Sequence, residues 1–315
     1  MVLMDKIKNS FGLPDKVEYE SVGEGHMNDT WIVSSESLKL FALRKYNSNR
    51  SYEDVQSEHQ ALQILEKLFG ALIASPLKGE GGNSIQQIDG SLFALFPFKK
   101  GVHPREDKRE NIEAAAIMLA FVHYKLWQER HLFAAIAFDR APILPEEFLS
   151  AQEIFDKLYI NIEPDVFASI GVTYSLLKSF EDRAKSSFSA IEPYAASKHL
   201  IHGDFGLPNL LVEEKSQKIC TILDWEEMRW DCPVFEIAAV LPFYEMAFPD
   251  AGNIFIEEYI LETDRLKHPD AVSIKTALEH IESAKFLANF WELTLMIKSG
   301  NIEPDYIKFL CEILA

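Results

Sequence analysis

The sequence has little positive charge. Lys and Arg number 31 against 49 Asp and Glu, which gives a formal net charge of -18 at pH 7. Nucleic acids and anionic membrane surfaces favour basic patches, so this balance argues against both kinds of partner. Net negative charge attracts cationic substrates, but it also keeps a protein in solution without any specific partner. Both explanations of the acidic composition stay open.

Cysteines are few and long apolar runs are missing. Cys220, Cys232 and Cys311 are widely spaced and form no C-x-x-C pair, so neither a disulfide framework nor a zinc site is predicted. Charged residues interrupt the first 14 positions, and no later apolar run approaches the roughly 18 residues of a membrane span. We therefore expect a cytoplasmic protein in a reducing compartment. The sequence does not determine its oligomeric state.

The length and the periodicity of the chain predict two lobes. A chain of 315 residues is too long for one small core. Strand-like segments within residues 16–46, a helix over about residues 51–69, and strands near 85–87 and 92–97 predict an antiparallel sheet with one main helix. Helical spacing dominates after residue 98. We expect an α+β fold with an N-terminal lobe over residues 1–97, made of a small antiparallel sheet and one main helix, and a larger, mostly helical lobe over 98–315.

The strongest motif is His-Gly-Asp-Phe-Gly-Leu-Pro-Asn at residues 202–209, followed by Asp-Trp-Glu at 224–226 after an apolar strand. Phosphoryl transfer to a hydroxyl needs a carboxylate that accepts a proton and oxygen ligands that hold Mg²⁺. Asp204, Asn209 and Asp224 supply that set.

The string Asp-Phe-Gly at residues 204–206 also matches the magnesium-binding D-F-G of protein kinases. A D-F-G should follow a catalytic Asp that has an Asn five residues later, yet the upstream Asp182 has Ser187 at that offset. Asp204 has Asn209 there. The spacing therefore predicts Asp204 as the base and Asp224 in the D-F-G role.

Together, H-G-D-x-x-x-x-N and D-W-E resemble the signature of the aminoglycoside phosphotransferase and choline kinase family. The resemblance implies a protein-kinase-like two-lobed fold, with a nucleotide-binding lobe over residues 1–97 and a catalytic and substrate-binding lobe over 98–315. It also implies transfer of the γ-phosphate of ATP, with Mg²⁺, to a hydroxyl of a small molecule. It implies Asp204 as catalytic base, Asn209 and Asp224 as metal ligands, and His202 as support for the catalytic loop. Amino alcohols such as choline or ethanolamine, homoserine-like compounds, sugars and aminoglycosides are all acceptors on this scaffold, so the fold does not fix the substrate.

Two residues upstream resemble the phosphate-binding pair of kinases. Phe-Ala-Leu-Arg at residues 41–44 is similar to the V-A-I-K strand, which makes Arg44 the expected contact of the α and β phosphates, with Arg where Lys is usual. Glu58 lies on the apolar stripe of its helix, where a carboxylate needs a cation. We expect Arg44 to be that cation.

The glycine-containing turn at residues 23–28 lies between two predicted strands. Glycine lets a backbone approach phosphates closely, so Gly23, Gly25 and Asn28 are candidates for phosphate contact. An ordinary hairpin turn is the alternative.

Residues 92–101 resemble the strand and interlobe hinge of the family. The backbone at Pro97, Phe98 and Lys99 is therefore expected at the adenine edge. The alternative is an edge strand that ends at a proline.

Two further positions bear on the catalytic loop. His123 ends a Leu-Ala-x-x-His string and is expected to be a hydrogen-bonded core residue. Glu236 stands where relatives have an Asp that braces the loop, and its longer side chain leaves that brace in question. A site for a cationic amine could come from the acidic and aromatic residues after Asp224, with core packing as the alternative; these are Trp225, Glu227, Trp230, Asp231, Tyr244 and Glu245.

Three other functions compete with a small-molecule kinase. A kinase-like nucleotide-binding or regulatory protein would share the fold without transferring phosphate. A protein kinase is disfavoured because no A-P-E element follows Asp224. A metal hydrolase using His199, His202 and Asp204 would leave Asn209 unexplained.

Overall fold

The computed structural model describes residues 2–24, 28–138, 140–143, 148–195, 198–300 and 302–315. The chain forms two compact units. Unit one comprises Met1–Arg105, Glu129–Asp139 and Leu207–Glu227, and unit two comprises Glu106–Gln128, Arg140–Gly206 and Met228–Ala315. The lobe boundary expected between residues 97 and 98 stays a prediction.

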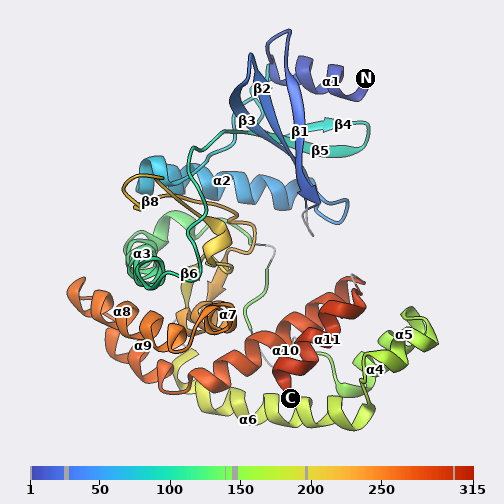
Figure 1. Ribbon diagram of the computed structural model, residues 1–315, viewed down its shortest axis with the longest axis vertical. Coiled ribbons are helices and arrows are strands. Elements are labelled where there is room, and N and C mark those ends of the chain that lie inside the picture. The colour runs from blue at the N-terminus through green and yellow to red at the C-terminus, as the bar shows by residue number, and fades with distance from the viewer. Residues whose placement is uncertain (1, 25–27, 139, 144–147, 196–197, 301) are drawn as a thin grey trace. The chain divides into compact units, whose positions relative to one another are not determined.

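Unit one contains the antiparallel sheet that the alternating sequence predicts (Figure 1). The strand order is β1-β2-β3-β5-β4. The strands span Glu18–Glu24 (β1), Asp29–Ser35 (β2), Leu38–Lys45 (β3), Gln86–Ile88 (β4) and Ser91–Pro97 (β5). Arg44 of β3 lies opposite Thr30 of β2 and Ala94 of β5, so strands on both sides fix its backbone.

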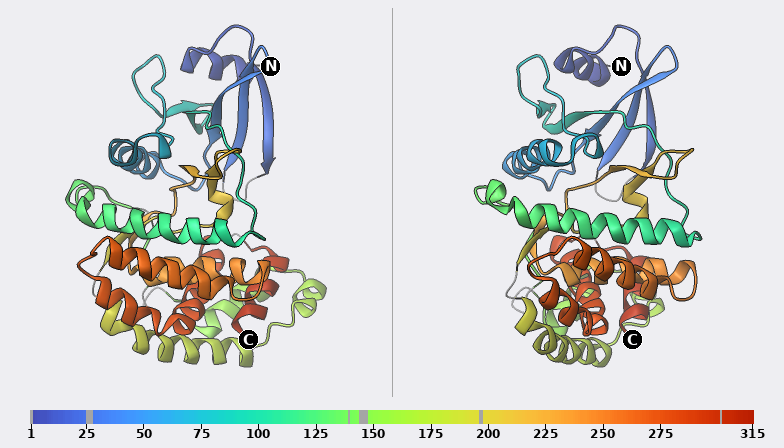
Figure 2. Two further views of the ribbon diagram at one scale, coloured as in Figure 1. Left: turned by 60° about the vertical axis from the view of Figure 1, so that its left-hand side comes forward. Right: turned by 90° about the vertical axis from the view of Figure 1, so that its left-hand side faces the viewer.

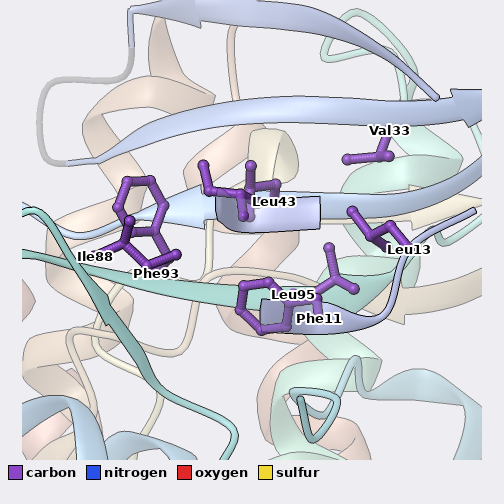
Figure 3. Packing of buried hydrophobic residues seen from close by; sticks show 8 residues of the cluster. Phe11, Leu13, Val33, Leu43, Ile88, Phe93 and Leu95 are labelled. Carbon is purple, nitrogen blue, oxygen red and sulfur yellow. The ribbon is translucent and has the colours of Figure 1, made fainter. Parts of the chain in front are cut away.

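One face of this sheet carries an apolar cluster, and the labelled side chains in Figure 3 gather there. Helix α1 (Val2–Phe11) contributes to it. The cluster contains Ile7, Phe11, Leu13, Val33, Leu43, Ile88, Phe93 and Leu95. Successive residues of a strand point to opposite faces. Because Leu43 is buried in this cluster, its neighbour Arg44 is directed to the other face, toward helix α2.

Helix α2 (Tyr52–Phe69) begins at a capping box. The hydroxyl of Ser51 accepts from the Asp54 backbone nitrogen at 3.1 Å, and the Asp54 carboxylate accepts from the Ser51 nitrogen at 3.0 Å. These bonds satisfy backbone donors that a helix start leaves unpaired. Glu58 and His59 lie among the buried residues of the helix, so its inner face carries polar groups as well as the apolar stripe.

A small hairpin completes unit one. Strand β7 (Leu210–Val212) pairs with β8 (Ile219–Ile222), and the short 3-10 helix η4 (Leu207–Asn209) leads into β7. Val102, shortly after β5, exchanges backbone hydrogen bonds with Val212 at 3.0 and 2.9 Å. The 3-10 helices η1 (Gly70–Leu72) and η2 (Arg130–Phe133) also belong to this unit.

Unit two is mostly helical, as the sequence predicts. Its helices are α3 (Arg109–Gln128), α4 (Ala151–Asn161), α5 (Pro164–Ser169), α6 (Tyr174–Ala195), α7 (Pro233–Ala247), α8 (Ala251–Arg265), α9 (Ala271–Leu278), α10 (Ile281–Ser299) and α11 (Pro304–Leu314). Green α3 and orange α8 run side by side in Figure 2. Strands β6 (His199–Ile201) and β9 (Arg229–Asp231) form a short antiparallel ladder. Among the described residues, no helix is both long and apolar enough to cross a bilayer.

Candidate functional site

The loop that carries Asp204 leaves strand β6 of unit two. Gly203 adopts φ 93°, in the region that favours glycine, so the chain can turn sharply there. The Asp204 nitrogen donates to Nδ1 of His202 at 3.2 Å, and the Gly206 nitrogen donates to the Asp204 carbonyl at 2.9 Å. His202 is fully buried and packs edge-on against Phe205. Local bonds therefore fold residues 202–206 into a defined turn.

Glu236 of α7 braces this turn from the buried side. One carboxylate oxygen accepts from the Gly203 nitrogen at 2.6 Å, and the other accepts from the His202 nitrogen at 3.1 Å. The longer side chain at this position therefore reaches the loop.

A buried histidine completes the brace. Nε2 of His123 on α3 lies 2.6 Å from the Glu236 carboxylate, and Nδ1 lies 2.7 Å from the hydroxyl of Tyr259 on α8. Burial opposes ionisation of Glu236, but hydrogen bonds from His123 and from the Gly203 nitrogen outweigh it and lower the pKa of Glu236. His123 is thus a hydrogen-bonded core residue, and Glu236 is favoured as a carboxylate.

The charge of Asp204 acts on two tyrosines of unit two, Tyr244 and Tyr306. The hydroxyl of Tyr244 donates to the Phe205 carbonyl at 3.4 Å. Burial, followed by the negative charges of Glu292 and Asp204, raises the pKa of Tyr306 to about 12. Asp204 and Glu292 thus both act electrostatically on Tyr306.

Several residues proposed for an amine site are instead part of the core. Trp225 is buried and donates to the Ile222 carbonyl at 3.2 Å. Asp231 is buried and accepts from Nε of Arg229 at 3.0 Å, and Tyr244 is buried as well. The structure favours the core-packing alternative for these three, because a bound amine could not reach buried side chains.

In unit one, Arg44 lies among carboxylates. Its Nη2 donates to Oδ1 of Asp224 at 3.2 Å, and its Nη1 lies 3.7 Å from Oε1 of Glu58 and 3.9 Å from Oε2 of Glu226. Burial alone would lower the pKa of Arg44. The attraction of Asp224 and the other carboxylates outweighs burial and raises the pKa above its ordinary value. The expected pairing of Arg44 with Glu58 is present, and the contact with Asp224 is shorter.

Burial leaves Glu226 harder to ionise than an ordinary glutamate. Burial, followed by repulsion from Asp224, raises the pKa of Glu226 to about 7. Burial also raises the pKa of Glu58, against the opposing attraction of Arg44 and Arg50. Arg44 and Arg50 thus balance carboxylates whose ionisation burial opposes.

The two predicted metal ligands flank a paired ladder. Leu210 pairs with Ile222, and the Leu223 nitrogen donates to the Asn209 carbonyl at 2.7 Å. The residue after Leu223 is Asp224, which has φ 57° and a side chain that is 35% exposed. An amide oxygen and a carboxylate oxygen suit Mg²⁺, which takes its remaining ligands from phosphates and water. These residues fit the ion.

The three residues expected to contact phosphate at the turn, Gly23, Gly25 and Asn28, differ in what the structure describes of them. Gly23 lies in β1, and Gly25 lies outside the described residues. The side-chain nitrogen of Asn28 donates to Glu226 at 2.5 Å, and its oxygen accepts from the Asn47 nitrogen at 3.1 Å. Asn28 therefore links the end of the turn to the carboxylate cluster.

Two of the three residues expected at the adenine edge, Phe98 and Lys99, donate hydrogen bonds within unit one. Pro97 ends β5 opposite Phe41, and the Phe98 nitrogen donates to the Leu40 carbonyl at 3.0 Å. Nζ of Lys99 donates to the Ala71 carbonyl at 2.9 Å, and burial lowers the pKa of Lys99. The Phe98 N–H is therefore occupied by the sheet.

Sequence reasoning missed Arg50 as a member of the site. Nη2 of Arg50 lies 3.1 Å from Glu58, and Nη1 lies 3.5 Å from Glu226. No motif marks Arg50, which follows β3 by five residues and precedes α2. The one signal was the buried Glu58, since such a carboxylate can take more than one cation.

Comparison with protein-family models gives a match over most of the chain. A family model described as "Phosphotransferase enzyme family" matches residues 18–268. Comparison with curated proteins finds no match.

Solved structures share the fold. An aminoglycoside phosphotransferase in complex with GDP and kanamycin is 17% identical, with a TM-score of 0.69 over 99% of this chain and 96% of the other. An amicoumacin kinase complexed with AMP-PNP and Ca²⁺ is 14% identical, with a TM-score of 0.67 over 99% and 91%. Ethanolamine kinase of Plasmodium vivax is 14% identical, with a TM-score of 0.63 over 99% and 85%. The predicted α+β fold class is confirmed.

Proposed function

Because the chain belongs to the phosphotransferase enzyme family, we propose that it transfers the γ-phosphate of ATP, with Mg²⁺, to a hydroxyl of a small molecule. The family predicted from the two motifs is confirmed, and with it an enzyme of the phosphotransferase class. The proposed phosphate transfer to an acceptor hydroxyl is supported by the two hydrogen bonds that Glu236 accepts from the loop of Asp204. A buried charged brace is expected where a loop must hold one carboxylate in a fixed orientation.

Unit one would bind the nucleotide. Asn209 and Asp224 would hold Mg²⁺, which neutralises phosphate charge when bound. Arg44 would contact phosphate oxygens, because a guanidinium offers several donors in one plane. Pro97, Phe98 and Lys99 remain our candidates for the adenine edge, with Gly23 and Gly25 as candidates near the phosphates; the contact of Asn28 with Glu226 supports an indirect role for Asn28.

Asp204 would act on the acceptor. The hydroxyl oxygen attacks the γ-phosphorus, the bond from that phosphorus to the β–γ bridging oxygen breaks, and the hydroxyl proton passes to the Asp204 carboxylate. ADP leaves with the bridging oxygen. Asp204 and Asn209 are five positions apart, so the chain keeps their Cα atoms within about 18 Å. The proposed base thus stays tethered to a proposed metal ligand.

A cationic acceptor is the substrate class we favour. The structural neighbours include an enzyme complexed with kanamycin, an aminopropanol kinase and an ethanolamine kinase, and these named compounds carry amines as well as hydroxyls. This chain has a net charge of -18, and the charges of Asp204 and Glu292 both act on Tyr306. Acidic surroundings attract amines and disfavour anionic acceptors.

The test is ADP release by the pure protein with Mg-ATP or Mg-GTP and a panel of amino alcohols, aminoglycosides, neutral sugars and anionic hydroxy acids. The proposal predicts turnover that depends on an amine-bearing acceptor. Turnover only with neutral or anionic acceptors would contradict the cationic class. Nucleotide binding without acceptor-dependent turnover across the panel would favour a regulatory nucleotide-binding protein.

A further inference from the structure

Arg50 closes a ring of alternating charges in unit one. Glu58 lies between the two arginines, with Oε2 3.1 Å from Nη2 of Arg50 and Oε1 3.7 Å from Nη1 of Arg44. Glu226 also lies between them, with Oε2 3.5 Å from Nη1 of Arg50 and 3.9 Å from Nη1 of Arg44. Each carboxylate is therefore shared by both guanidinium groups.

Both carboxylates lie closer to Arg50 than to Arg44. The difference is 3.1 against 3.7 Å for Glu58 and 3.5 against 3.9 Å for Glu226. Among these three carboxylates, Arg44 lies closest to Asp224, at 3.2 Å. The principal counter-ion of Glu58 is thus Arg50, although the sequence motif points to Arg44.

The ring is largely removed from water. Side-chain exposure is 4% for Glu58, 7% for Glu226 and 11% for Arg50, whereas Asp224 is 35% exposed. Arg50 also lies over the ring of Tyr46, with its guanidinium carbon 5.9 Å from the ring centre. Buried charges are weakly screened, so the loss of one partner is felt by the others.

We propose that Arg50 is a positioning residue of the nucleotide site, an inference that rests on the proposed function. By holding Glu58 and Glu226, Arg50 leaves the guanidinium of Arg44 available to Asp224 and to phosphate oxygens. Arg50 also sets the charge of the site. With Asp224, Glu58 and Glu226 all ionised, the two arginines leave a formal charge of -1, and Arg44 alone would leave -2. Because burial raises the pKa of Glu226 to about 7, this count applies above that pH.

This role predicts opposite effects on two ligands. Without Arg50, Arg44 is drawn toward Glu58 and Glu226, and the site becomes more negative. An anionic nucleotide then binds more weakly, whereas a bare divalent cation binds more tightly at Asp224. General loss of structure would weaken the binding of both ligands. Opposite changes in the two affinities therefore identify the positioning role.

The experiment compares Arg50→Gln with the wild-type enzyme for two probes measured separately. Calorimetric titration with Mg-AMP-PNP gives the nucleotide Kd, and electron paramagnetic resonance of free Mn²⁺ gives the cation Kd without nucleotide. We expect Arg50→Gln to raise the Kd of Mg-AMP-PNP about tenfold and to lower the Kd of Mn²⁺ about threefold. The thermal unfolding midpoint, recorded in parallel, shows whether each variant is folded.

Two variants serve as controls. Lys45→Gln removes one positive charge from β3, where Lys45 pairs with Asp29 at 3.1 Å outside the ring, and both constants should stay within about twofold of wild type. Arg50→Lys keeps the charge but loses the planar fork, so Mn²⁺ binding should match wild type while nucleotide binding lies between wild type and Arg50→Gln.

The results separate a failure of the Arg50 inference from a failure of the proposed function. Unchanged constants in folded Arg50→Gln, or both ligands weakened together, would overturn the role of Arg50 while leaving the proposed function intact. A wild-type protein that binds Mn²⁺ but not Mg-AMP-PNP or Mg-GTP would overturn the proposed function, and the inference with it.

Discussion

The carboxylate of Glu236 accepts a hydrogen bond from the backbone nitrogen of Gly203 at 2.6 Å. Gly203 precedes Asp204, and the other carboxylate oxygen of Glu236 accepts from His202 at 3.1 Å. All atoms of Glu236 are buried. A charged acceptor in a buried site makes strong hydrogen bonds, so this contact fixes the loop more firmly than a surface contact could.

Replacing this carboxylate by an amide should disturb catalysis more than nucleotide binding. In Glu236→Gln, the NH₂ group would face one of the two backbone N–H donors, and that donor would lose its acceptor. We expect kcat to fall by about 10- to 100-fold, with the KM for nucleotide within about twofold. Steady-state kinetics give both constants. Glu262→Gln, which only breaks a pair with Arg265 on α8, should keep kcat, and equal losses in the two variants would argue against the brace.

Arg44 should contribute to nucleotide binding through its charge and through its planar shape. Arg44→Gln removes the cation beside Asp224, so the Kd for Mg-AMP-PNP should rise by about 10- to 100-fold. Arg44→Lys should recover part of that loss, since a lysine supplies charge without a fork. Calorimetric titration measures both. An unchanged Kd in folded Arg44→Gln would show that phosphate binds elsewhere.

Gly101 allows the segment after β5 to approach the β7–β8 hairpin. A Cβ at this position would lie 2.8 Å from Cβ of Leu211, 3.1 Å from the Val212 carbonyl oxygen and 3.3 Å from Sγ of Cys220. Gly101→Ala must push the hairpin away, so the free energy of unfolding should fall by about 1–3 kcal/mol. Urea denaturation measures this change.

Gly81→Ala is the matched control, because a Cβ there meets no atom within 4 Å. Its stability should stay within about 0.5 kcal/mol of wild type. Similar losses in both variants would mean that the approach at Gly101 is not tight.

Buried histidines should make unit two sensitive to acid. Burial, followed by the charge of His123, lowers the pKa of His268 to about 4. His268 stacks on His199, whose pKa burial also lowers to about 4, while Asp270 opposes both shifts. Such groups are neutral when folded and take up protons on unfolding. Their stabilisation is complete above the unfolded pKa of 6.5 and is lost as the pH falls toward 4.

The expected loss from His268 alone is on the order of 2 kcal/mol between about pH 7.5 and about pH 5. Urea unfolding of wild type, His268→Gln and His131→Gln at the two pH values measures it. His131 is exposed, so His131→Gln should keep the wild-type pH dependence, whereas His268→Gln should lose part of it. The same slope in all three proteins would contradict neutral burial of His268.

Local patterns predicted much of the fold. The helix at residues 51–69 was foreseeable because apolar spacing and the Ser51–Asp54 capping box act within a few residues. The spacing of Asp204 and Asn209 predicts a base and a metal ligand, and these roles stay predictions. The contact of Asn28 with Glu226 was not, since it joins side chains 198 positions apart. Such contacts depend on side-chain directions at the ends of separate strands, which periodicity does not encode.

The burial of Trp225 shows the same limit from the opposite side. Its place beside Asp224 left both an amine site and core packing open. The ring centroids of Trp225 and Phe69 lie 6.4 Å apart, and the indole nitrogen donates to the Ile222 carbonyl. Adjacent residues of an irregular segment can face solvent and core in turn. Sequence adjacency to a candidate ligand therefore did not predict accessibility.

The central claim is that Asp204 activates an acceptor hydroxyl. The most direct test is ³¹P NMR of the phosphorylated acceptor formed by wild type and by Asp204→Asn, with Mg-AMP-PNP binding measured on the same preparations. The account predicts a phosphate ester with wild type, a loss of at least about 10³-fold in its rate of formation in Asp204→Asn, and similar nucleotide Kd values in the two proteins. Equal rates of ester formation in the two proteins would contradict the role of Asp204.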